Sequence, residues 1–204
     1  MASAAPPPRP PFNRRRALAA AIAAAALGAF YVVSGRGLTF PPDTVPEGAY
    51  LRIAQNVAEG RPRDCFAYLE EPAQHAAYSI RDYRKRASDR VAATYPEPER
   101  TRLIELYRAH ATAEDGADIW ADMAQKRGWV TRLRRDLSGV AKVEIAGERA
   151  TIETARGTRY GFRRRANGIW ALTLFTAELV AEAERAARDA EIVEKAAADY
   201  ERGR

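Results

Sequence analysis

Residues 141–174, AKVEIAGERATIETARGTRYGFRRRANGIWALTL, decide the fold, because apolar and polar side chains alternate along them with a period of two. Such alternation is typical of β-strands that bury one face. Gly147, Gly157 and the Asn167-Gly168 pair interrupt it, and Asn-Gly is a strong signal of a tight hairpin turn. We therefore predict a four-stranded antiparallel meander. Its inward-facing residues are predicted to be Ala141, Val143, Ile145, Ala150, Ile152, Thr154, Tyr160, Phe162, Trp170, Leu172 and Leu174.

The stretch before the strands has apolar residues at three- and four-residue spacing, which is typical of helices that pack on a sheet. Thr44-Val45-Pro46-Glu47 fits a capping box, and Gly60 is predicted to end this first helix. Further helices are expected from Pro62, from Pro72, after Pro98, from Asp115 to Gly128, and around Val130 to Leu137. We find no alternating stretch between Tyr50 and Leu137. Residues 44–175 are thus predicted to form one α+β domain.

The segment 176–204 is predicted to be a long helix with a narrow apolar stripe dominated by alanine. The stripe consists of Leu179, Ala183, Ala186, Ala190, Val193 and Ala197. So little apolar surface leaves two interpretations open. Either the helix packs at the periphery of the domain, or its small-residue seam meets a partner, which includes a second copy of the chain in an oligomer.

The N-terminal part is predicted to be held in a membrane. Residues 1–16 are rich in proline and end in Arg14-Arg15-Arg16, so we expect a disordered cytoplasmic tail. Ala17 to Val33 then runs for 17 residues without a charge, the lower limit for a helix that spans the lipid bilayer. Basic residues precede this transmembrane anchor and few follow it, so the N-terminus is expected to stay in the cytoplasm. Residues 34–43 are expected to be a linker rich in Gly and Pro.

A cleaved secretory signal sequence is the alternative, because it also has a basic start and a short apolar stretch. Ala26-Leu27-Gly28 could serve as a weak cleavage site, but Phe30 to Val33 continue the apolar run beyond it. An uncleaved single-pass anchor in the cell membrane is therefore favoured. Either interpretation places the C-terminal domain outside the cytoplasm, and cleavage would leave it periplasmic or secreted. A buried soluble helix is disfavoured because the run has no polar face.

The net charge of +6 suggests a nucleic-acid-binding protein at first sight, but the position of the charges argues against it. Five arginines lie in residues 1–36, which contain no Asp or Glu, and residues 37–204 have 28 basic against 27 acidic side chains. Binding to nucleic acid needs a concentrated basic face. We therefore predict no nucleic-acid partner.

Helices followed by a hairpin-rich sheet, from Tyr50 to Phe175, resemble the nuclear-transport-factor-2-like (NTF2-like) α+β cone superfamily. The resemblance is carried by VEIAGERATIET at 143–154, GTRYGF at 157–162 and NGIW at 167–170. Members of this superfamily include isomerases, ligand binders and catalytically silent scaffolds, and some combine a short cytoplasmic tail, one membrane helix and an exported cone. The resemblance implies a cone-like domain in that layout, without assigning a function.

An isomerase of that kind would need a carboxylate or histidine base in an apolar pocket, facing a donor such as a tyrosine. The candidates are Asp82, Tyr83, Tyr107, His110, Asp118 and Tyr160. Asp115 and Asp118 also fit the acidic first turn of a helix, and a lone histidine on an apolar helix face is typical of a hydrogen-bonded core residue. We therefore predict no catalytic residue.

The remaining chemistry-bearing residues have ordinary structural explanations. Cys65, the only cysteine, is expected to be a small buried apolar residue. Two histidines and one cysteine give no metal-ligand spacing, and glycines occur singly, so no metal or cofactor is predicted. Arg163-Arg164-Arg165 could contact anionic lipid or a partner, but a solubilising strand end is favoured.

These features predict a membrane-tethered, extracytoplasmic interaction or assembly domain without catalysis, which presents its sheet or C-terminal helix to an unknown protein partner. A small-molecule-binding cone, with isomerase-like activity, is the alternative. A closed apolar pocket containing Asp118 or His110 would favour the alternative. An exposed apolar stripe on Ala177–Ala197 would favour the interaction domain.

Overall fold

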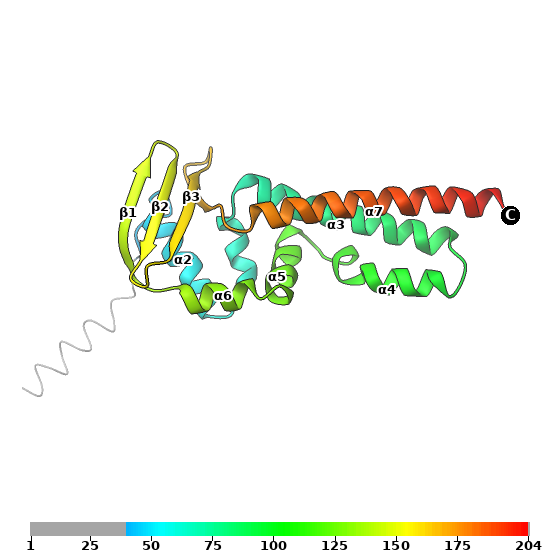
Figure 1. The fold of residues 1–204 in the computed structure, drawn as a ribbon, viewed down its shortest axis with the longest axis horizontal. Coiled ribbons are helices and arrows are strands. Elements are labelled where there is room, and N and C mark those ends of the chain that lie inside the picture. Colours follow the sequence, from blue (N-terminus) through cyan, green and yellow to red (C-terminus); the bar gives the residue numbers. More distant parts are fainter. Residues whose placement is uncertain (1–39, 204) are drawn as a thin grey trace, which may run out of the picture. The chain divides into compact units, whose positions relative to one another are not determined.

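The computed structural model describes residues 40–203, which belong to one compact unit. The predicted tail, the predicted anchor Ala17 to Val33 and most of the predicted linker lie outside the described residues. Between residues 40 and 203, no helix is both long enough and apolar enough to cross a membrane. The α+β class, the four-stranded antiparallel sheet and the long C-terminal helix are confirmed (Figure 1).

The sheet is the meander that the alternating stretch predicts. It consists of β1 (Val140–Ala146), β2 (Arg149–Thr154), β3 (Arg159–Arg164) and β4 (Trp170–Leu172), which pair in sequence order, each antiparallel to its neighbour. Gly147, Gly157 and Gly168 lie at the three turns with φ angles of 61°, 79° and 84°. Only glycine adopts this left-handed region without steric cost, so the glycines fix where each strand reverses.

The predicted inward-facing pattern holds on β2, β3 and β4 but fails on β1. A bulge between Val140 and Lys142 leaves Ala141 as an extra residue outside the pairing of this edge strand with β2. Ile145 is 59% exposed and Ala141 is exposed too, so the prediction that both face the core was wrong. β4 ends at Leu172, and Leu174 therefore lies beyond the strand in which it was predicted.

The helical half precedes the sheet. It comprises α2 (Pro46–Ala58), the 3-10 helix η1 (Pro62–Tyr68), α3 (Glu71–Thr94), α4 (Glu99–Ala111), α5 (Gly116–Lys126) and α6 (Trp129–Asp136). The predicted capping box at Thr44 was wrong. Val45 is the N-cap of α2 and gives no side-chain cap, while the backbone carbonyl of Thr44 accepts a hydrogen bond from Trp170 Nε1 at 3.1 Å. Pro46, in the first turn, has no backbone N–H, so its nitrogen needs no capping acceptor.

The main core lies between the sheet and helices α2, η1 and α5. Its largest fully buried side chains include Tyr50, Leu69, Ile119, Trp120, Ile152, Phe162 and Leu172. The Tyr50 hydroxyl donates a hydrogen bond to the carbonyl of Ser138 at 2.7 Å, which ties α2 to the segment that enters β1. Leu69 forms an isolated parallel bridge with Leu172, so η1 is fastened to β4.

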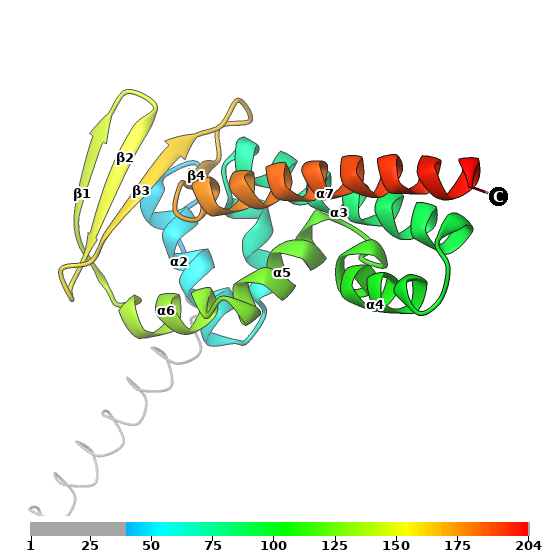
Figure 2. The same cartoon turned by 45° about the vertical axis from the view of Figure 1, so that its right-hand side comes forward.

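The C-terminal helix α7 (Thr176–Arg202) lies along α3, and both run away from the sheet (Figures 1 and 2). Leu179, Ala186, Ala190, Val193 and Ala197 of the predicted stripe are all buried. Small side chains let the two helices approach closely, so the apolar stripe of α7 packs against α3 of the same chain. The interpretation of α7 as packed on its own domain therefore holds, and the exposed stripe on Ala177–Ala197 that would have favoured an interaction domain is not found.

Candidate functional site

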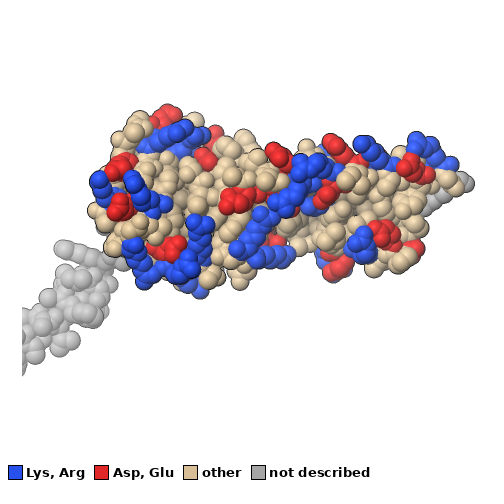
Figure 3. Space-filling view, viewed as in Figure 1, with Lys and Arg blue, Asp and Glu red and all other residues tan. Residues whose placement is uncertain are grey.

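An open groove of about 500 Å³ lies between α4 and α7. Figure 2 shows the two helices on either side of α3, towards the C-terminal end of α7. The groove is lined by Tyr95, Leu103, Tyr107, Ile192, Val193, Ala196 and Tyr200, together with the charged residues Glu99, Arg102 and Asp189. In Figure 3, much of the surface between α7 and α4 is tan, so charged side chains leave this strip largely uncovered.

The deep side of the groove is held in place by tyrosines. The ring of Tyr95 meets the ring of Tyr200 edge to face, with centroids 5.0 Å apart. The Tyr95 hydroxyl donates to the carbonyl of Val193 at 3.1 Å, and the guanidinium of Arg84 lies 5.1 Å from the centre of the Tyr107 ring. Burial raises the pKa of both Tyr95 and Tyr107, so these side chains stay neutral near pH 7. The groove therefore offers a fixed aromatic floor.

The outer side of the groove exposes large apolar side chains. Ile192 of α7 is 64% exposed and Tyr200 is 38% exposed. Leu106, 66% exposed, follows Leu103 by three residues on α4, so it lies on a neighbouring part of the same helix surface. Single exposed leucines are ordinary, but exposed apolar side chains such as Ile192 and Tyr200 beside a groove are typical of a binding surface.

A buried carboxylate fixes the position of α7, and hence one wall of the groove. Glu182 accepts a hydrogen bond from Arg127 Nη2 at 2.5 Å and lies 3.4 Å from a guanidinium nitrogen of Arg84 and 3.3 Å from one of Arg185. Burial alone would raise the pKa of Glu182, but these guanidinium groups outweigh it and hold the pKa below its ordinary value of 4.5. Arg84 also pairs with Asp189 at 2.5 Å, so α3, α7 and the end of α5 meet in one network.

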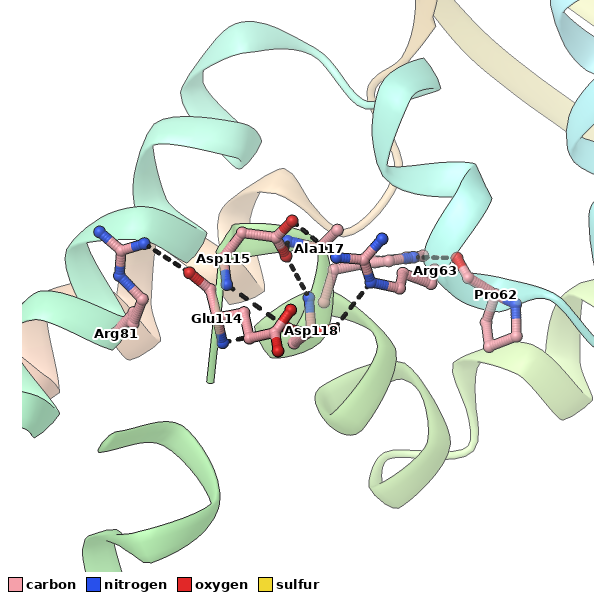
Figure 4. A network of polar contacts seen from close by, with 8 residues as sticks. Pro62, Arg63, Arg81, Glu114, Asp115, Ala117 and Asp118 are labelled. Carbon is pink, nitrogen blue, oxygen red and sulfur yellow. Dashed lines mark hydrogen bonds and ion pairs between the residues drawn. The ribbon is translucent and has the colours of Figure 1, made fainter. Parts of the chain in front are cut away.

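Asp118, the leading sequence candidate for a base, is a helix cap (Figure 4). Asp115 and Asp118 form a capping box at the start of α5. Arg63 donates to Asp118 Oδ1 at 2.8 Å and to Asp115 Oδ2 at 2.7 Å. The hydrogen bond from Arg63 holds the pKa of Asp118 below its ordinary value, whereas a general base of the isomerase type needs an apolar setting that raises it.

His110, Asp82 and Tyr83, which are also candidates from the sequence, each contact a different partner residue. His110 Nε2 lies 2.9 Å from Asp122 Oδ2, so the predicted hydrogen bond of this half-buried histidine is confirmed, and it joins α4 to α5. Asp82 is exposed and pairs with Arg81 at 2.7 Å. The Tyr83 ring lies under the guanidinium of Arg86, 5.4 Å from its centroid. None of these three candidates lines the groove between α4 and α7.

Two further residues from the sequence analysis belong to the main core. Tyr160 packs beside Tyr50 with ring centroids 5.8 Å apart, and burial raises its pKa to about 12. Cys65 is buried, as predicted, and burial raises the pKa of its thiol to about 12. Both groups stay protonated at neutral pH, so they contribute packing and not reactivity.

The arginine run on the β3–β4 hairpin is tied to the start of α3. Arg163 lies 3.8 Å from a carboxylate oxygen of Glu70, and Arg165 lies 3.7 Å from one of Glu71. Arg165 also donates to the carbonyl of Ala67 at 3.0 Å. The three arginines therefore hold the β3–β4 hairpin against the start of α3, in addition to keeping this end of the sheet hydrated. For residues 40–203, no cluster of three or more His, Cys, Asp or Glu side chains could hold a metal ion.

The groove could not be predicted from the sequence analysis, because each helix was judged there only by the apolar stripe that it is expected to bury. Tyr107 was considered only as a donor, and Val193 only as part of the alanine stripe. A usable signal was present, since Ile192 and Tyr200 are large apolar residues outside the stripe on an otherwise charged helix. Comparing the chain with protein-family models, with curated proteins and with solved structures gives no match, so the NTF2-like resemblance stays a prediction and the site is described from its own geometry.

Proposed function

We propose that this chain is a membrane-tethered protein-interaction domain on the extracytoplasmic side of a cell membrane, and that a protein partner docks in the α4–α7 groove. The tether is the uncharged segment Ala17 to Val33. The observation that carries the proposal is the strip of exposed apolar side chains beside a fixed floor of tyrosines. Tyrosine and aliphatic anchors around a groove are typical of protein interfaces.

The partner that fits this groove is an amphipathic helix. The groove is walled by two helices, so a third helix laid into it would contact α4 and α7 at once, as in helix-in-groove recognition. Apolar side chains at three- and four-residue spacing on the partner would meet Leu103, Ile192 and Ala196. The ion pairs at its edge, Glu99 with Arg102 and Asp189 with Arg84, are already satisfied and would stay at the polar rim.

The alternative function, a small-molecule-binding cone, has less support. Such a cone would bind its ligand between the sheet and the helices, where the Tyr50 and Tyr160 rings pack together. The six candidate residues for an isomerase are distributed over a helix cap, separate surface pairs, the groove and the core. We therefore do not include catalysis in the proposal.

The docking proposal is tested by site-specific photo-crosslinking of the full-length protein in membranes of cells that make it. A photoreactive phenylalanine analogue replaces Ile192 on the groove, or Glu184, which is exposed on α7 away from the groove. We expect a defined adduct from position 192 and none from position 184. Mass spectrometry of the adduct is expected to map to an amphipathic helical segment of the partner.

A groove-filling variant provides the control. Ala196→Arg places a long side chain in the groove from a half-buried position, and it is expected to abolish the adduct while the protein keeps its thermal stability and its membrane association. An adduct that persists in Ala196→Arg would contradict docking in the groove. Release of the wild-type protein from membranes by carbonate would contradict the tether, whatever the crosslinks show.

A further inference from the structure

The first residues that the structure describes, 40–42, lie beside α2. The backbone carbonyl of Pro41 accepts a hydrogen bond from Arg52 Nη1 at 2.6 Å, and a side chain at Gly48 would collide with the same carbonyl. Residues 40–42 therefore run over the first turns of α2. The neighbouring face of that helix, beginning at Leu51, is consequently close to the point where the chain leads back to the predicted anchor.

A second groove, of about 360 Å³, lies on this neighbouring face. It is lined by Leu51, Ala54, Val57, Ala58, Arg134, Leu137, Ser138 and Gly139. Most of these side chains are apolar, and Arg134 donates from its guanidinium to the carbonyl of Val57 at 3.2 Å across the groove. The groove is thus an apolar strip between α2 and the segment that connects α6 to β1.

Arg134 lines this strip, and three more arginines lie on the same helix or on the turn fastened to it. Arg132, Arg134 and Arg135 lie on α6, and Arg156 comes from the β2–β3 turn. Arg156 donates from its guanidinium to the carbonyl of Arg135 and from its backbone N–H to Ser138 Oγ at 3.2 Å, so the turn is fastened to the end of α6. All four side chains belong to exposed residues, and Figure 3 shows blue atoms over α6 and over the adjoining end of the sheet.

The charge of this basic face is only partly neutralised within the chain. Asp136, which lies 3.0 Å from Arg135 Nε, is the one acidic residue between positions 132 and 139. Arg134 and Arg156 donate hydrogen bonds to backbone carbonyls, and neither guanidinium pairs with a carboxylate among residues 40–203. An apolar strip bordered by arginines is the pattern of surfaces that settle on anionic membranes.

We propose that this face, formed by the α2 groove and by Arg132, Arg134, Arg135 and Arg156, rests on the anionic lipid headgroups of the membrane that carries the anchor. The inference rests on the proposed tether. The seven residues 34–40 span at most about 25 Å even when fully extended, so the face that adjoins Pro41 is held near the bilayer. Attraction to anionic lipid acts within a Debye length, about 8–10 Å, and so short a connecting segment lets this face approach the headgroups to that distance.

The occupant is a lipid surface and not a nucleic acid or a free phosphate, because the short connection to the proposed anchor keeps lipid beside this face. The α4–α7 groove lies towards the far end of α7 from the sheet and α6 (Figure 2). Docking on lipid through α6 would leave that groove accessible. The two surfaces therefore serve separate purposes, orientation on the membrane and recognition of a partner.

The experiment uses the full-length protein in proteoliposomes of neutral lipid, or of neutral lipid with about 30% phosphatidylglycerol. A fluorophore is attached to Ala58→Cys in the basic face, or to Ala166→Cys on the β3–β4 turn at the opposite end of β3. Cys65 is buried and does not compete for the label. With a quencher on the lipid headgroups, we expect quenching at position 58 to rise at least about twofold when anionic lipid is present, and quenching at position 166 to stay unchanged.

Charge reversal supplies the matched control. Arg132→Glu with Arg135→Glu is expected to remove the anionic-lipid effect, whereas Arg108→Glu with Arg188→Glu, an equal change in charge at exposed positions, is expected to keep it. A normal thermal melt of each variant shows that it is folded. Equal quenching at position 58 in both lipids, with the protein still floating with the vesicles, would overturn the lipid-facing inference alone. Failure to float would overturn the tether and this inference together.

Discussion

The buried carboxylate of Glu182 gives the sharpest prediction. Glu182→Gln keeps the shape of the side chain and removes its charge, so Arg127, Arg84 and Arg185 would face a neutral amide. Breaking a buried ion pair costs about 3–5 kcal/mol when the remaining charge is fully trapped. Arg84 keeps Asp189 and Arg185 is half exposed, so we place the loss for Glu182→Gln at about 2–3 kcal/mol. For a unit of this size, that corresponds to roughly 5–10 °C in Tm.

The assay is urea unfolding of the full-length protein in mild detergent, followed by tryptophan fluorescence. Trp129 is a suitable reporter because the guanidinium of Arg127 lies 5.5 Å from the centre of its ring. The pH dependence adds a second test. The folded-state pKa of Glu182 is lowered, so its contribution is present above the ordinary value of 4.5 and is lost as pH falls through the folded-state pKa. The gap in unfolding free energy between wild type and Glu182→Gln should therefore be full at pH 7 and shrink below pH 4.5.

Glu184→Gln is the matched control, because Glu184 lies on the same helix, is exposed, and has only a 4.0 Å pair with Arg188. Its effect should stay within about 0.5 kcal/mol. Equal losses in the two variants would refute the claim that the Glu182 network anchors α7. A gap for Glu182→Gln that grows towards low pH would refute the assigned direction of the pKa shift.

Three further predictions concern single side chains. Cys65, with its thiol pKa raised to about 12 by burial, should react with a maleimide at pH 8 only after unfolding, and fast labelling of the native protein would show that the thiol is accessible. Asp115→Ala removes the hydrogen bonds to the backbone of Ala117 and Asp118, and should cost about 1 kcal/mol in urea unfolding, with no loss if the cap is unimportant. Ala186→Leu puts extra atoms into the closed seam between α3 and α7 and should destabilise by about 1–3 kcal/mol, while unchanged stability would mean that the seam has room.

The sheet could be predicted from sequence because its signals are local. Alternation and turn glycines are properties of neighbouring residues, and Gly147, Gly157 and Gly168 take the backbone conformation that such turns need. β1 shows the limit of this reasoning. Ile145 continues the alternating pattern but is 59% exposed at the end of the edge strand β1, and the sequence does not reveal where the covering layer stops.

The candidate site could not be predicted, because it depends on contacts between residues far apart in the chain. Tyr95 and Val193 are 98 positions apart, as are Arg84 and Glu182. Periodicity shows which face of a helix is apolar but not which other helix covers it. The alanine stripe of α7 was compatible with either a partner or its own domain, and only the position of α3 decides between them. The large residues that remain uncovered, such as Ile192, then become visible as a surface.

The pairing of α3 with α7 also determines when the chain can finish folding. Arg84 meets Asp189 across 105 positions, and Arg90 meets Glu194 across 104. Translation at about 5–20 residues per second leaves α3 without its covering helix for roughly 5–20 seconds after it leaves the ribosome. During that interval Ala87 and Val91 can be covered by Leu103 and Tyr107 of α4, but Ala190, Val193 and Ala197 of the same cluster have not yet been made. Helix α7, which is made after α3, therefore completes the fold, and truncation before α7 should favour aggregation over a shorter native fold.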